Sequence, residues 1–260
     1  MAPIEDAALR SLLADLRAIP SGREEKTNEL ENLIDYLEIA AVAAGEKPSH
    51  LQGQGRRSRG FMHAIERVAG VHGLLVMRTP PVPTYYHRAP HYDPRFFEWE
   101  RQRDRESCAR EGHVLWIYRD RNLESAIRAA VEGEADVAEV LGYPPCCVRE
   151  NSELGIRLAE ARVRGYQSQY GATDVEDFIR LATQDARVEI TRTDWPEFRH
   201  VFPYVQFSPC SHCAESSSSP AAEVNWAMKR LATRLSPAFQ RAIDKAAKAA
   251  LEVREAKRRR

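Results

Sequence analysis

Four of the five cysteines in this chain fall in two tight groups. Cys146 and Cys147 occur inside Leu-Gly-Tyr-Pro-Pro-Cys-Cys-Val, and Cys210 and Cys213 occur inside Ser-Pro-Cys-Ser-His-Cys. A reduced protein ordinarily scatters its cysteines as small buried hydrophobic residues, so two groups that each follow proline indicate thiol or metal chemistry. For a single pair of cysteines, packing in the core would be as good an explanation as thiol or metal chemistry. Because there are two, we expect Cys146, Cys147, Cys210 and Cys213 to form one metal site.

The spacing of these cysteines leaves three arrangements open. They are a four-cysteine zinc or iron–sulfur site, a three-cysteine site with His212 or solvent as the fourth ligand, and metal-free thiol couples. A Cys-x-x-Cys turn can direct two sulfurs at one metal ion. Adjacent residues point in different directions, so we expect unequal roles for Cys146 and Cys147, one as a ligand and the other, with Cys147 preferred, as a catalytic thiol.

Two further groups of side chains are candidates for acid–base or metal chemistry. His87 and His91 lie in the segment from Thr79 to Arg95, which has five prolines and three tyrosines. Long irregular segments within compact domains are often functional, so both histidines are candidate catalytic residues, although a surface loop is the more common explanation. Glu150 and Glu153 follow the cysteine pair and either act as acid–base groups or complement a helix dipole.

The periodicity of apolar residues predicts mostly helix around these groups. We expect helices over 4–19, 21–45, 123–131, 135–141, 148–164, 174–181, 220–235 and 237–257, strands over 73–78 and 113–119, and strands or extended segments over 188–190 and 201–207. Pro144 and Pro145 would place Cys146 and Cys147 at a helix N-terminus, where thiolates are stabilised. The glycine-rich stretch 47–60 reads as a linker or mobile basic loop.

The predicted fold class is α+β, mostly helical with a small sheet, and both cysteine groups fall at junctions between elements. We divide the chain into a helical extension with a basic glycine-rich loop (1–60), a core domain with the cysteine site (61–235) and a C-terminal helix with a basic tail (236–260). The length of 260 residues is enough to bury a substantial core.

Composition narrows the classes of partner and compartment. There are 38 basic and 38 acidic residues, so no overall field attracts nucleic acid or an anionic membrane. Arg56, Arg57 and Arg59 could contact phosphate, but a solvated basic loop is the more common explanation. No stretch approaches the roughly 20 apolar residues of a membrane helix, and an odd number of cysteines argues against a disulfide framework. We therefore expect a cytoplasmic protein without a membrane partner.

The string Gly142-Tyr143-Pro144-x-Cys146-Cys147, followed by Pro209-Cys210-x-x-Cys213, resembles a little-characterised bacterial and archaeal domain family. That family carries a Gly-Tyr-Pro-x-Cys-Cys motif and a later proline–cysteine pair. The resemblance covers roughly residues 113 to 230 and implies a shared cysteine site. It implies no particular activity.

Two functional hypotheses follow from the sequence. The first is an enzyme of small-molecule metabolism that performs redox or sulfur chemistry, as a metal- or thiol-dependent oxidoreductase or sulfur-transfer enzyme, at a transition-metal or iron–sulfur centre. The second is a binding or adaptor protein in which the same cysteines hold a structural zinc and the basic loop contacts RNA or a partner protein. No Gly-rich phosphate loop, nucleotide-binding fingerprint or Gly-x-Ser-x-Gly motif supports ATP, NAD or serine-hydrolase chemistry.

Overall fold

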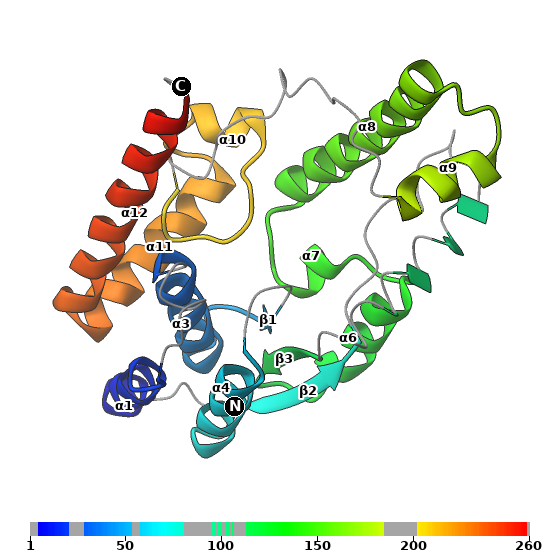
Figure 1. Ribbon diagram of the computed structural model, residues 1–260. Coiled ribbons are helices and arrows are strands. Elements are labelled where there is room, and N and C mark those ends of the chain that lie inside the picture. The colour runs from blue at the N-terminus through cyan, green and yellow to red at the C-terminus, as the bar shows by residue number, and fades with distance from the viewer. Residues whose placement is uncertain are drawn as a thin grey trace.

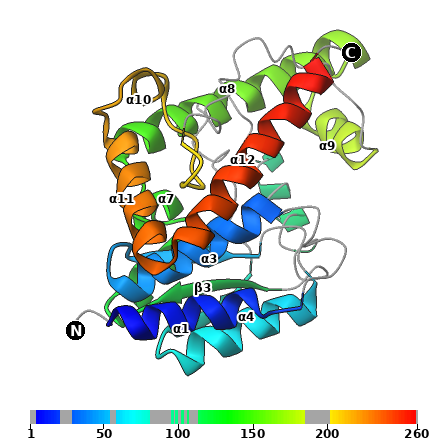
Figure 2. The same ribbon diagram turned by 90° about the vertical axis from the view of Figure 1, so that its left-hand side faces the viewer.

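The architecture of the chain is given by a computed structural model (Figures 1 and 2). The structure describes residues 5–20, 29–53, 58–80, 95–96, 98–99, 102–103, 106, 113–184 and 202–258. The segment that contains His87 and His91 lies outside these residues, as do Arg56 and Arg57. Among the described helices, none combines the length and the hydropathy needed to cross a bilayer.

A small antiparallel sheet lies at the centre of the N-terminal half. Its strands are β1 (Ser49–Gln52), β2 (Leu75–Thr79) and β3 (Val114–Tyr118), in the order β1-β3-β2. Trp116 of β3 lies opposite Leu51 on one side and Met77 on the other. All five residues of β3 are buried, as expected for a central strand with a continuous apolar run. The predicted strands over 73–78 and 113–119 are thus confirmed.

Two predictions about irregular and extended segments were wrong. The stretch 47–60, read as a linker or mobile loop, contains strand β1, in which His50 and Gln52 are buried. The sequence of β1 is too polar to be recognised as a buried strand. Its buried polar side chains form hydrogen bonds with Glu38 and Asp35 of α3, and the local sequence does not reveal these partners. Residues 202–207, expected to be extended, form turns and bends instead. Their aromatic residues are buried individually, so burial there does not require a strand.

The largest hydrophobic core joins the two ends of the chain. It is formed by α1 (Asp6–Arg17), α3 (Glu29–Ala44), α4 (Arg59–Val71), α11 (Pro220–Leu235) and α12 (Pro237–Arg258), together with residues of the sheet. Strand β3 contributes Leu115 and Ile117 to this core, with α3 beside β1 and α4 beside β2 (Figures 1 and 2). Residues from the first 60 and from the last 25 positions therefore share one core with the middle of the chain.

The remaining described helices lead toward the cysteines. They are α6 (Leu123–Glu132), α7 (Val137–Val140), α8 (Pro145–Tyr170), α9 (Val175–Thr183) and the short α10 (Ser211–Glu215). α6 and α7 pack on the sheet through a second core that includes Trp116 and Ile127. α8 then leaves this core, and its first turn lies beside the loop that contains Cys210. The mostly helical fold with a small sheet matches the predicted class.

A buried polar network attaches β1 to α3. The ring of His50 contacts Glu38 Oε2 through Nδ1 at 2.9 Å and Gln52 Oε1 through Nε2 at 3.1 Å. Gln52 donates its amide N–H to Asp35 at 2.9 Å, so its oxygen faces His50. His50 thus links Glu38 to Gln52, and Gln52 in turn links His50 to Asp35. Lys47 binds Glu38 at 2.7 Å, so the buried Glu38 carboxylate contacts an ammonium group as well as the His50 ring.

Glu38 is expected to make stability depend on pH. Burial opposes its ionisation, but Lys47 and His50 outweigh this effect and lower its pKa from 4.5 to about 2. A lowered folded-state pKa gives stability that is present above pH 4.5 and is lost as the pH falls toward 2. A difference of this size corresponds to about 3 kcal/mol of unfolding free energy.

We predict that Glu38→Gln lowers the unfolding free energy at pH 7 by about 3 kcal/mol, because Lys47 and His50 lose the buried charge that they face. The deficit relative to the unsubstituted protein should shrink as the pH falls from 4.5 toward 2, measured by urea denaturation at each pH. Glu46→Gln is the matched control, since Glu46 forms a half-exposed pair with Arg234 and should change stability by less than about 1 kcal/mol. A deficit that is constant across this pH range would contradict the assignment.

Candidate metal centre

The four cysteines of the two sequence groups meet at one point. One Sγ atom from each of Cys146, Cys147, Cys210 and Cys213 lies within 4.8 Å of every other. Cys146 Sγ is 4.0 Å from Cys147 Sγ and 3.6 Å from Cys213 Sγ. The four thiols are free, so none is in a disulfide. Three are buried, and Cys146 is partly exposed.

The first cysteine pair occupies the first turn of α8. Pro144 is the N-cap and Pro145 the first helical residue, where a missing N–H costs nothing. Cys146 and Cys147 therefore hold the second and third helical positions, near the free amides and the positive end of the helix dipole. Successive helical residues are separated by about 100°, so the two side chains can flank a common point. Both sulfurs lie in the group, and the expected difference in role between Cys146 and Cys147 stays a prediction.

The second pair lies on the turn that leads into α10 and α11, and backbone amides face its sulfurs. Cys210 is the N-cap of α10, and its N–H donates to Cys147 Sγ at 3.3 Å. The N–H of Cys213 donates to Cys210, and the N–H of Ala221 in the first turn of α11 donates to Cys213. Ser219 caps α11 at Ala222 and also donates to the carbonyl of Cys213 at 2.9 Å. Three of the four sulfurs therefore accept a backbone hydrogen bond.

Two polar side chains of α8 fix the loops relative to each other. Asn151 donates from one amide nitrogen to the carbonyl of Cys147 at 2.8 Å and to the carbonyl of Ser208 at 2.6 Å. Glu150 accepts from the N–H and the hydroxyl of Ser211 at 2.8 and 2.9 Å. These contacts hold the start of α8 against α10. The carboxylate of Glu150 thus binds the first residue of α10 from the neighbouring helix.

The surroundings shift the pKa values of the clustered thiols in different directions. Burial raises the pKa of Cys147, and burial also raises the pKa of Cys210. Burial opposes ionisation of Cys213 as well, but the N–H of Ala221 and the neighbouring thiols outweigh it and lower the pKa of Cys213. Cys213 is therefore the thiol whose ionisation its surroundings favour, whereas burial disfavours the thiolate forms of Cys147 and Cys210.

The arrangement could hold a metal ion. Four thiolates around one zinc or iron ion, with metal–sulfur distances of about 2.3 Å, place their sulfurs about 3.8 Å apart in a tetrahedron. The distances of 4.0 and 3.6 Å bracket this value. Phe202, Phe207 and Ala222 pack around the sulfurs and complete an apolar shell.

The other predicted site residues do not join this group. His212 is exposed on α10 and is not among the clustered ligands of the described residues, so the arrangement with His212 as a fourth ligand is not supported. His87 and His91 lie outside the described residues, and their catalytic role stays a prediction. Cys147, the preferred catalytic thiol, is only 1% exposed, and Cys146 is the more accessible member of the pair.

Sequence reasoning missed the residues that support the cysteines. Asn151 gave no signal, because an asparagine inside a helix is common. Tyr143 and Phe207 stand three positions before Cys146 and Cys210, and their rings pack with centroids 4.9 Å apart. This matched spacing was visible in the sequence and could have indicated that both loops meet.

Comparison of the chain with protein-family models, with curated proteins and with solved structures gave no match. The resemblance to a Gly-Tyr-Pro-x-Cys-Cys family therefore stays a prediction that rests on the motif.

We predict that Asn151→Ala lowers the affinity for zinc by about 10-fold or more, because outer hydrogen bonds that orient metal ligands typically contribute 10- to 100-fold. Competition with a coloured chelator measures the affinity. Glu153→Ala is the matched control, since Glu153 is exposed two positions further along the same helix. Equal affinities for the two variants would contradict a positioning role for Asn151.

Proposed function

We propose that this protein is a metalloprotein in which Cys146, Cys147, Cys210 and Cys213 hold a single tetrahedral ion, zinc or iron. The observation that carries this proposal is the mutual approach of all four Sγ atoms to within 4.8 Å. Soft thiolates in a tetrahedral set of four select zinc or iron over magnesium and calcium, which prefer oxygen ligands.

The distances favour one ion over a multinuclear cluster. In a [4Fe–4S] cluster each cysteine binds a different iron at a separate corner, so the sulfurs stand farther apart than around one ion. A group in which every pair lies within 4.8 Å suits a shared centre. Backbone N–H groups that face three sulfurs help to stabilise the net negative charge of a four-thiolate complex.

The role that the geometry supports best is structural. Four protein ligands leave no open position on a tetrahedral ion, and closed sites of this kind stabilise folded structure. Here the ion would join the start of α8 to α10 and α11, elements that are 63 residues apart in the chain at the closest cysteine pair. The part of the protein around the site has a small core of its own, which includes Phe202, Phe207 and the cysteines.

The exposure of Cys146 supports a second candidate, redox or sulfur chemistry in an enzyme of small-molecule metabolism. Cys146 is the partly exposed member of the four, so its sulfur is the one that an electron partner or a small molecule reaches most readily. An iron ion in the same site would exchange electrons, whereas zinc would not. Contact of the basic loop with RNA has no support from the described residues.

We predict that removing the metal loosens the cysteine region and leaves the main core folded. After chelation, amides of residues 143–150 and 202–219 should exchange with deuterium at least about 10-fold faster, because the ion would be the main connection between these two segments. Amides of α3 and β3 should keep their protection, since their core does not include the cysteines. Adding zinc should restore the original pattern.

Metal analysis of protein purified without oxygen separates the two candidates in the same sample. One colourless zinc per chain favours the structural role, and one iron that is reversibly reduced, with visible charge-transfer bands, favours the redox role. Unchanged exchange at 143–150 and 202–219 after chelation, or a chain that folds fully with no metal, would contradict the proposal.

A further inference from the structure

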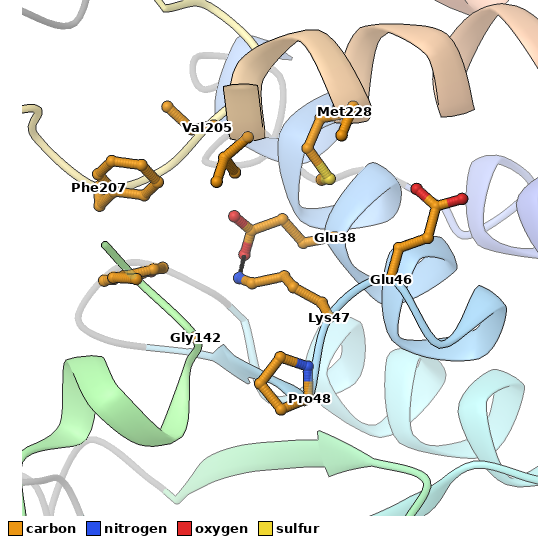
Figure 3. A pocket seen from close by; sticks show the side chains of 11 residues that line it. Glu38, Glu46, Lys47, Pro48, Gly142, Val205, Phe207 and Met228 are labelled. Atoms are coloured by element: carbon orange, nitrogen blue, oxygen red, sulfur yellow. Dashed lines mark hydrogen bonds and ion pairs between the residues drawn. The ribbon is translucent and has the colours of Figure 1, made fainter. Parts of the chain in front are cut away.

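A pocket beside the cysteine site is built from the same two loops. It lies between the end of α3, the segment that enters β1, and α11, and it has a volume of about 100 Å³. Its apolar walls are formed by Tyr143, Val205, Phe207, Val224 and Met228. Figure 3 shows Val205, Phe207 and Met228 around the head groups of Glu38 and Lys47.

The polar end of this pocket is a charged pair. Lys47 Nζ donates to Glu38 Oε2 at 2.7 Å, and the ammonium lies 5.0 Å from the ring centroid of Tyr143. Both side chains are at least nine-tenths buried. Glu38 uses the same oxygen, Oε2, for His50, and among the described residues no hydrogen bond to its Oε1 is found. Glu38 is likewise the sole hydrogen-bond acceptor of Lys47 within the described chain.

The Gly-Tyr-Pro-x-Cys-Cys string contributes both to the pocket, through Gly142 and Tyr143, and to the cysteine group, through Cys146 and Cys147. Gly142 has a φ of +73°, and a Cβ there would lie 2.8 Å from Cδ of Pro48, so only glycine allows this loop to approach the entrance of β1. Tyr143 then lies over Lys47, and Cys146 and Cys147 follow in the metal group. Phe207 repeats this arrangement from the other loop, because it lines the pocket three residues before Cys210.

We propose that this pocket binds a small zwitterionic amino acid with an apolar side chain. The carboxylate of the ligand would accept from Lys47, and its ammonium group would donate to Oε1 of Glu38. These two protein groups are adjacent, as are the two charged groups of an α-amino acid. The side chain would lie against Phe207, Val224 and Met228.

Charge balance favours a zwitterion over an anion or a cation. The Glu38 carboxylate and the Lys47 ammonium form a one-to-one ion pair, so this pair adds no net charge to the polar end of the pocket. Glu46 at the edge of the pocket pairs with Arg234, and its carboxylate points away from Glu38 and Lys47 in Figure 3. A ligand with a single charge would leave one charge unmatched beside a partly buried pair, which is unfavourable.

The size of the pocket also limits the ligand. A cavity of about 150 Å³ accommodates benzene, so the buried part of the ligand has to be smaller than that ring. The carboxylate and the ammonium group of the ligand take up part of this volume together with its side chain, so small amino acids such as alanine and valine suit the pocket and tryptophan does not. The inference goes beyond the proposed metal centre, although Tyr143 and Phe207 depend on the cysteine loops for their positions.

The four methionines of the chain provide a direct test, because Met228 lines the pocket and Met62 and Met77 do not. The metal-loaded protein is labelled with ¹³C on the methionine methyl groups and titrated with L-alanine or L-valine. Isobutylamine and isovalerate, which are valine without its carboxylate and without its amino group, are the comparison ligands. We expect a saturable shift of the Met228 signal with at least one amino acid, and affinities at least about 10-fold weaker for the amine and for the acid.

Variants of α11 locate the binding and keep the charged pair intact. Ala227→Leu places extra volume in the pocket and should abolish the shift, whereas Arg230→Leu adds the same side chain at an exposed position of α11 and should preserve it. No shift of Met228 with either amino acid, equal binding by isovalerate or isobutylamine, or unchanged binding by Ala227→Leu would overturn the proposal. Metal content measured in the same samples shows separately whether the metal centre is present.

Discussion

The mutual approach of four thiols is the constraint on which this part of the structure depends. Each thiol is neutral and weakly polar by itself, and burial of Cys147 and Cys210 opposes the ionised form that binds metal. Helix starts and backbone amides reduce this cost, because α8 and α11 direct their N-terminal ends at the sulfurs. An ion among the four sulfurs would complete the balance. Such an ion would join the first turn of α8 to the loop that contains Cys210 and Cys213.

The same two loops position the cysteine group and one wall of the pocket. The rings of Tyr143 and Phe207 pack at a tilt, with centroids 4.9 Å apart, because the two cysteine loops meet, and they form one wall beside Lys47. On the opposite side, Glu38 holds the ammonium group of that lysine in place, and Glu38 in turn contacts the buried His50. The pocket therefore lies where the two cysteine loops meet the buried carboxylate network of α3.

Sequence patterns predicted the elements that depend on residues close together in the chain. Most of the described helices, two of the three strands and the four clustered cysteines follow from periodicity, proline positions and residue type, whereas α4 and the short α10 were not predicted. Strand β1 was missed because His50 and Gln52 are buried only through partners on α3, which no local pattern reveals. The direction of two adjacent cysteines was also beyond prediction, because it depends on helix geometry and on where Cys210 and Cys213 arrive. The supporting contacts of Asn151 arise only when α8 meets the loop at Ser208.

X-ray absorption at the edge of the bound metal tests the central claim most directly, because it counts the ligands and measures their distances. The account predicts a single shell of four sulfur atoms at about 2.3 Å and no second metal in the outer shell. The shell should lose sulfur when any one of Cys146, Cys147, Cys210 and Cys213 is replaced by serine. Nitrogen or oxygen ligands in the unsubstituted protein, or a neighbouring metal at short distance, would contradict a closed four-thiolate centre with one ion.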